Sequence, residues 1–208
     1  MKFIKISLST ILLVSLTGCA SLLPSVLPDP IAAGTIYRLS TAKQSVAQAP
    51  NAFVVRIDRP SVSNVFETTD IIVSPDGRRL ASASGAQWAE IIPVMIQNSF
   101  VDVLGQNPNI VGVVPSSGAR TDTRIHLTVK SFEAQFDQGD GAAPLAVVHY
   151  AATLSNASNR NLLGSFDVRR TVRASEARVS SIVQAMDNAN QQALEQITQW
   201  LAQPRNRS

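Results

Sequence analysis

The sequence has few of the residues that build disulfide, metal or redox sites. Its 208 residues include one cysteine, Cys19, and two histidines, His126 and His149. A single cysteine excludes a disulfide within this chain, and it excludes a cysteine-rich metal cluster. The chain also contains no His-Glu-x-x-His run and no Gly-x-Ser-x-Gly elbow. The common signatures of zinc peptidases and of α/β-hydrolases are therefore absent.

Charged and aromatic side chains are scarce as well. They make up 16% and 5% of the chain, and the formal net charge is +3. Two of the basic residues, Lys2 and Lys5, lie at the N-terminus. Without residues 1–18 the net charge falls to about +1. The rest of the chain has no basic footprint of the kind that binds nucleic acid, so no nucleic-acid partner is expected.

The chain begins with a short apolar stretch. Lys2 and Lys5 precede residues 6–16, which are uncharged and largely apolar. A membrane-spanning helix needs roughly 20 such residues, about twice this length. A basic start, a short apolar segment and then small residues are the layout of a secretory signal peptide. We therefore predict a signal peptide over residues 1–18.

The end of this stretch gives the lone cysteine a role. Leu16-Thr17-Gly18-Cys19 resembles the lipobox of bacterial lipoproteins. The resemblance implies diacylation of the Cys19 thiol, cleavage before Cys19 and acylation of the new α-amine. Several acyl chains anchor a protein stably, whereas one chain holds it only marginally. The alternative is a free or buried thiol in a cytosolic protein. Lipidation predicts a protein outside the cytoplasm, tied to a membrane by a lipid anchor.

The remaining chain divides into a tether and a domain. Pro24, Pro28 and Pro30 remove backbone donors and fix φ, so residues 19–35 are expected to form an extended tether after the lipidated cysteine. Residues 36–203 then form a single domain of ordinary size, long enough to bury an apolar core. With no second cysteine, that core has to supply the stability of the domain.

Strands are predicted through most of the domain. Residues rich in β-branched side chains predict strands at 51–58 and 109–114, and a hairpin over 70–84 turning at Pro75-Asp76-Gly77. A three-stranded meander follows over 123–172, with turns at 138–141 and 156–159. In its first strand Ile125, Leu127 and Val129 share one parity, whereas Phe132 and Phe136 have the other. This change predicts a β-bulge near Ser131.

Two helices complete the expected fold. One is predicted within residues 86–106, with Pro93 in its first turn and Gly105 at its end, and a second runs through 178–203. Both have apolar residues at steps of three and four. In the first helix these residues are Ile92, Met95, Ile96, Phe100, Val103 and Leu104. In the second they are Val179, Ile182, Val183, Met186, Ala189, Ala193, Ile197 and Leu201. The predicted class is α+β: a mostly antiparallel sheet with two helices packed on one face.

Several short motifs together resemble a known family. Tyr37-Arg38-Leu39 opens the domain, Trp88-Ala89-Glu90 precedes the first helix, and Phe132-Glu133 ends an alternating strand. With the lipobox and the Ala- and Leu-rich last helix, they resemble the ABC-type transport auxiliary lipoproteins, the PqiC-like lipoproteins of MCE lipid-transport systems. The chain departs from the family pattern at Ile91-Ile92-Pro93 and over residues 59–69.

The resemblance implies a function. Such lipoproteins accompany an ABC transporter and an MCE-domain protein that move lipid between the two membranes. They would dock the MCE component at the outer membrane, on its periplasmic side, without catalysis and without a cofactor. Ala20, rather than aspartate, follows Cys19, which favours the outer membrane by the same resemblance. A closed homo-oligomeric ring is compatible with exposed strand edges.

More than one role is open for the candidate site residues, and more than one function for the protein. Trp88, Glu90 and Phe132 are either partner contacts or core contacts. A stand-alone lipid- or ligand-binding lipoprotein is the main competing function, with Phe132, Phe136 and Tyr150 lining a pocket. A periplasmic hydrolase would need a nucleophile close to His149. Both histidines have the polar parity of their strands, which predicts surface positions and no metal site.

Overall fold

The structure is a computed structural model, and it describes residues 34–40 and 46–203. These residues belong to one unit, Ala33–Ser208. The predicted signal peptide, the lipobox residues Leu16, Thr17 and Gly18, and the lipidation site Cys19 lie outside the described residues, as does nearly all of the tether.

The described residues form nine strands, two α-helices and two short 3-10 turns. The strands are β1 Thr35–Tyr37, β2 Phe53–Ile57, β3 Ser61–Val62, β4 Asp70–Ser74, β5 Ala81–Trp88, β6 Ile110–Val113, β7 Thr123–Gln135, β8 Leu145–Asn156 and β9 Leu162–Arg173. The helices are α1 Ile92–Leu104 and α2 Val179–Ala202, and the turns are η1 Asn64–Phe66 and η2 Pro115–Ser117. The expected hairpin, meander and two helices are all present.

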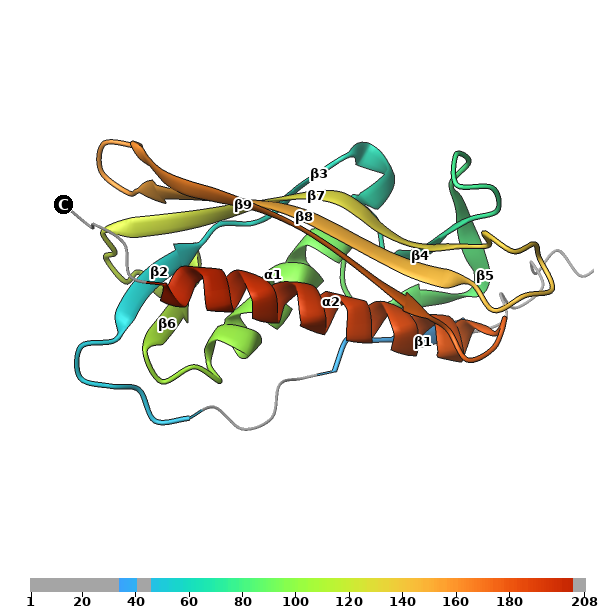
Figure 1. Cartoon of the computed structure of the whole chain (residues 1–208), viewed down its shortest axis with the longest axis horizontal. Coiled ribbons are helices and arrows are strands. Elements are labelled where there is room, and N and C mark those ends of the chain that lie inside the picture. The colour runs from blue at the N-terminus through green and yellow to red at the C-terminus, as the bar shows by residue number, and fades with distance from the viewer. Residues whose placement is uncertain (1–33, 41–45, 204–208) are drawn as a thin grey trace, which may run out of the picture. The chain divides into compact units, whose positions relative to one another are not determined.

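The long strand β7 organises the sheet (Figure 1). Along one edge it pairs antiparallel with β8, which pairs antiparallel with β9. Along the other edge it receives β2, β3 and β4 in succession, and all three run parallel to it. Outside these, β5 pairs antiparallel with β4 and β1 parallel with β5, while β6 pairs parallel with β2.

The prediction of a mostly antiparallel sheet is therefore wrong, because the sheet is mixed. Five of the eight strand pairings among the described residues are parallel. The reason lies in the connection between β4 and β7. After β4 the chain passes through β5, helix α1, strand β6 and turn η2. It thereby returns to the end of the sheet at which β2 begins. Such a long crossover is what parallel neighbours require.

The predicted bulge in β7 is confirmed. The register between β7 and β8 shifts between Val129 and Ser131. Before the shift Val129 pairs with Tyr150, and after it Phe132 pairs with Val148. All four of these side chains are buried. The extra residue lets both halves of a 13-residue strand point their apolar side chains at one core.

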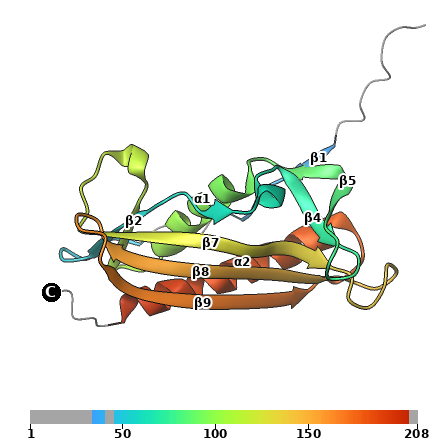
Figure 2. The same cartoon turned by 90° about the horizontal axis from the view of Figure 1, so that it is seen from above.

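Both helices lie on the same face of the β7–β9 meander (Figures 1 and 2). Helix α2 packs along β9, β8 and β7, and α1 packs against α2, β6 and β2. In α1, Pro93 lies in the first turn and Gly105 caps the C-terminus. The predicted apolar faces of the two helices are buried in the common core, apart from the half-buried Val179. Among the described residues, neither helix has the length and apolarity that a membrane span requires.

Candidate functional site

Trp88 and Phe132 pack against each other in the core. Their ring centroids lie 5.9 Å apart at an interplanar angle of 55°, and their exposed fractions are 1% and 0%. A tilted pair at this separation is a favourable aromatic geometry. The backbone N–H of Trp88 donates to the carbonyl of Thr69, which fixes the end of β5. The Trp-Ala-Glu motif therefore begins as part of the packed interior.

Glu90, two residues later, lies at the surface. It borders a cavity of about 200 Å³ formed where the segment after β1 meets α1. The Asn98 amide donates to Glu90 Oε2 at 3.1 Å, which orients the carboxylate. We call this cavity the Glu90 pocket; its lining residues are Arg38, Leu39, Ser40, Glu90, Met95, Asn98, Ser99 and Asp102.

The rim of the Glu90 pocket is mainly acidic. Among the described residues, Glu90 and Asp102 line it, with Arg38 as the one basic residue of that lining. Ser40 extends the rim to α2, because its backbone N–H donates to Asp187 Oδ1 at 3.2 Å and its hydroxyl donates to Asp187 Oδ2. Three carboxylates against one guanidinium give this surface a negative potential. Its chemistry suits a basic or hydrogen-bonding partner surface.

A series of buried hydrogen bonds leads from the sheet to the Glu90 pocket. The Tyr150 hydroxyl on β8 donates to Asn190 Oδ1 on α2 at 2.7 Å. The Asn190 amide donates in turn to Ser99 Oγ on α1 at 2.9 Å. Burial raises the pKa of Tyr150 well above its usual value, so the hydroxyl stays protonated and remains a donor. This series of hydrogen bonds joins the sheet to both helices and ends at a residue of the pocket lining.

Sequence reasoning did not identify this series of hydrogen bonds, although one signal was available. Asn190 lies four residues after Met186, on the apolar face of α2. A polar side chain at a core position needs a buried partner. Its partner on β8 is the hydroxyl of Tyr150, which alternation places among the apolar positions of the strand.

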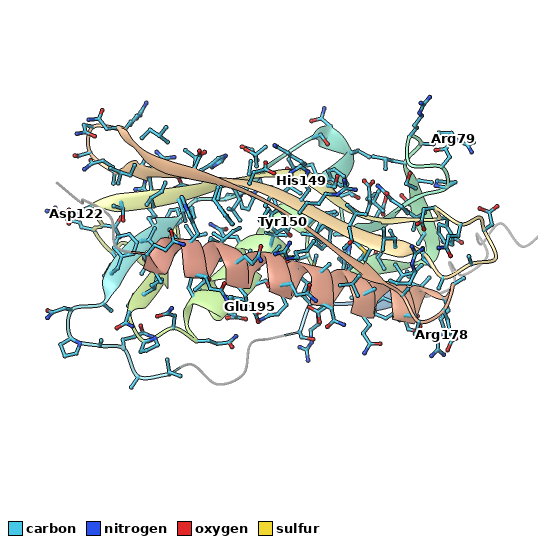
Figure 3. The ribbon with its side chains drawn as sticks, viewed as in Figure 1. Arg79, Asp122, His149, Tyr150, Arg178 and Glu195 are labelled. Atoms are coloured by element: carbon cyan, nitrogen blue, oxygen red, sulfur yellow. The ribbon has the colours of Figure 1, made fainter. Side chains whose placement is uncertain are left out.

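Both histidines form surface hydrogen bonds. His126 Nε2 lies 2.8 Å from Ser61 Oγ, across the β3–β7 pairing. His149 Nε2 lies 2.7 Å from Asp167 Oδ1, and Lys130 Nζ lies 2.6 Å from Asp167 Oδ2. The ammonium of Lys130 and the imidazole of His149 lower the pKa of Asp167. Neighbours on a strand point to opposite faces, so His149 faces away from the side where Tyr150 meets α2 (Figure 3).

The partners of the two histidines are a hydroxyl and a carboxylate. No three His, Cys, Asp or Glu side chains gather to hold a metal ion in the part of the chain that the structure describes. His149 has a carboxylate partner rather than a nucleophile. Ser61, the residue paired with His126, is exposed on a two-residue strand.

The three side chains expected to line a pocket in a stand-alone binding protein lie in or against the core. Phe132 and Tyr150 are completely buried, and Phe136 packs against the same core. Side chains that are this well covered contribute packing rather than a cavity wall. The three side chains line none of the three cavities identified among the described residues.

Solved structures show the same fold. The crystal structure of protein XCC0632 from Xanthomonas campestris is 20% identical, with a TM-score of 0.69, and the match covers 80% of this chain and 94% of that one. The crystal structure of an uncharacterized protein is 14% identical, with a TM-score of 0.66 over 81% and 99% of the two chains. No protein of curated function matches the chain.

The sequence itself matches a family model over most of the domain. Residues 37–198 match the ABC-type transport auxiliary lipoprotein component. The matched span runs from the last residue of β1 nearly to the end of α2, and it includes both Trp88 and Glu90. It confirms the family that the motifs resemble. This chain belongs to the ABC-type transport auxiliary lipoprotein family.

Proposed function

We propose that the chain is a non-enzymatic accessory lipoprotein of an ABC/MCE intermembrane lipid-transport system. In this role it docks the MCE component at the outer membrane. The observation that carries the proposal is the family match over residues 37–198, which names a transport component rather than an enzyme. The packed apolar core between the helices and the sheet agrees with a docking role.

The anchoring half of the proposal rests on the N-terminal sequence. Residues 1–18 would be removed, Cys19 would carry the lipid, and residues 19–35 would connect the membrane to the domain at 36–203. Ala20 supports the outer membrane as the destination. The acyl chains supply the membrane affinity, and the tether supplies reach.

The docking half of the proposal rests on the Glu90 pocket. Glu90 belongs to the Trp-Ala-Glu motif, yet it lies at the surface while Trp88 is buried. A partner can reach Glu90 and the neighbouring Asp102, and it cannot reach Trp88 or Phe132. We therefore assign the contact with the MCE component to this acidic surface, where basic side chains of the partner would be attracted.

Self-association is a further part of the proposal. Within the described residues β9 pairs only with β8, so its outer edge offers 12 residues of backbone for strand addition. A closed ring would satisfy such edges and would present several docking surfaces to one partner assembly.

The test is to capture the lipidated chain from membranes and identify what co-purifies. We expect an MCE-domain protein with its ABC transporter. Cys19→Ala should release the chain from the membrane fraction, and Glu90→Gln should reduce recovery of the partner several-fold while leaving the membrane association intact. Glu195→Gln, an exposed α2 carboxylate, serves as the matched control. Recovery of no MCE protein with a monomer in solution would overturn the proposal.

A further inference from the structure

A second cavity lies at one end of the sheet, away from the motifs that carry the family resemblance. Its volume is about 420 Å³, within the range of roughly 300–1,000 Å³ that is typical of small-molecule sites. Four segments meet there: the start of β2, the residues leading into β7, the end of β8 and the start of β9. Figure 3 shows Asp122, one of its lining residues, at this end of the sheet.

One wall of this cavity is rich in hydrogen-bond donors. Arg120 and Asn156 line it, and their side chains carry a guanidinium and an amide. The Asn156 Oδ1 already accepts from the backbone N–H groups of Ser158 and Asn159, so the NH₂ is the group left to donate.

Thr121 adds a hydroxyl that the protein does not satisfy. Its Oγ1 is buried and has no hydrogen-bond partner among the described residues. Thr121 also lines the cavity. A buried hydroxyl without a partner is costly, and nearly all such groups in proteins are satisfied by protein, water or ligand. An oxygen atom of a bound molecule in the cavity would meet this need.

The opposite wall is apolar and continues to the surface. Phe53, Val54 and Leu163 line it. Val54 is 38% exposed, and Leu162, directly before Leu163 in β9, is 66% exposed. These are two of the few large apolar side chains that the described surface leaves exposed. Val54 lines the cavity itself, so the apolar wall reaches the surface there.

Backbone and side-chain bonds hold the four segments together. The Thr123 hydroxyl on β7 donates to the Val54 carbonyl on β2 at 3.2 Å. The Ala157 N–H, in the turn after β8, donates to the Asp122 carbonyl at 2.8 Å. The walls are thus joined across the cavity without any ligand, so the site is preformed.

We propose that this cavity binds a small amphiphilic anion. Arg120, Thr121 and Asn156 receive its oxyanion, a carboxylate or a phosphate monoester, and Phe53 and Leu163 receive a short apolar part. Asp122 adds a negative charge to the lining. Its repulsion lowers the affinity for an anion that has no apolar part, so the apolar contact is needed for binding. The ligand could be a free amphiphile or a lipid headgroup with the start of its chain. This inference does not depend on the proposed transport role.

The test uses the processed chain, residues 19–208, carrying Cys19→Ser, so that it has neither the apolar signal peptide nor a lipid and is handled without detergent. Titration with hexyl phosphate, followed by calorimetry, should show saturable one-to-one binding. Arg120→Gln and Thr121→Val should each weaken it about tenfold or more, and Asp122→Asn should strengthen it. Arg79→Gln, at an exposed arginine on the β4–β5 turn, is the matched control and should change nothing. Inorganic phosphate has the oxyanion without the apolar part, and hexanol has the apolar part without the oxyanion. Each should bind at least tenfold more weakly than hexyl phosphate.

A second arm distinguishes the two ligand sources. Arg120-dependent flotation of the same chain with phosphatidylglycerol vesicles identifies a lipid headgroup, whereas binding of hexyl phosphate alone identifies a free amphiphile. Absence of saturable binding, or equal binding by the Arg120→Gln chain, would overturn the inference. Thermal unfolding without ligand establishes that each variant is folded. Loss of hexyl phosphate binding would leave partner capture through the Glu90 pocket unaffected, so the two proposals fail separately.

Discussion

Gly112 on β6 is the position where the packing of the domain can be tested most directly. A Cβ built on Gly112 would lie 2.8 Å from Ile57 Cδ1 and 2.9 Å from Leu104 Cδ1. Ordinary carbon–carbon contacts are about 3.5–4.0 Å, so the overlap approaches 1 Å against two separate side chains. Both Ile57 and Leu104 are fully buried and cannot turn toward solvent. Gly112→Ala should therefore behave as an overpacked core.

The expected loss is about 1–3 kcal/mol in the free energy of unfolding, the usual cost of forcing an extra methyl group into a filled interior. For a domain of this size that loss lowers the Tm by roughly 2–12 °C. Urea denaturation and thermal unfolding followed by circular dichroism measure both quantities. Gly141→Ala is the control, since its added Cβ meets nothing within 4 Å, and it should stay within about 0.5 kcal/mol of the parent.

A second substitution separates overpacking from other causes. Leu104→Ala alone should cost about 2–5 kcal/mol because it leaves a cavity. In the Gly112→Ala chain the same change also removes one of the two clashes, so its cost should be smaller by at least about 0.5 kcal/mol. A stable Gly112→Ala protein, or strictly additive effects of the two substitutions, would refute this account of the β6–α1 contact.

Two further predictions concern the series of buried hydrogen bonds and an exposed turn. Tyr150→Phe leaves Asn190 Oδ1 without its donor and should cost about 1–3 kcal/mol in urea denaturation; an unchanged midpoint would mean that the bond contributes nothing. Backbone N–H bonds from Arg79 and then Arg78, followed by the Arg79 side chain, lower the pKa of Asp76 from 3.8 to about 2. Because the folded pKa is the lower one, the stabilisation of the turn by Asp76 is complete above about pH 4 and disappears as the pH falls through about 2. An NMR titration of the Asp76 carboxyl should show this midpoint, and a midpoint near 3.8 would contradict the turn geometry.

Local patterns predicted the elements well. The three- and four-residue spacing located both helices, and Pro75-Asp76-Gly77 located the β4–β5 hairpin. The parity change between Val129 and Phe132 located the bulge. Each of these features depends on neighbours within a few residues, so the information is present in a short stretch of sequence.

The strand pairing of the sheet could not be predicted in the same way. Alternation in a strand shows which face is buried, but it does not show the direction of the neighbouring strand. The parallel partners of β7 are short, and β3 has only two residues, too few to show a period. Their placement is decided by packing between segments far apart in the chain.

The sites were predicted only in part. The motif at Trp88 and Glu90 was found, but its division into a core residue and a surface residue depends on the turn between β5 and α1. The Arg120–Thr121–Asp122 cavity was missed because its lining comes from four segments. The patterns of those segments predict strands but no shared site, and Thr121 becomes notable only once its hydroxyl is seen to be buried without a partner among the described residues.

The succession of short parallel strands along β7 has a consequence for how the protein is made. Val55 pairs with Thr123 and Ser74 with Gln135, so these contacts join residues more than 60 positions apart. As the polypeptide leaves the ribosome, residues 53–74 emerge long before the strand that they pair with. Until then their β-forming side chains stay uncovered, and closing such large loops is slow. We expect late, high-contact-order folding that benefits from a holding chaperone during synthesis.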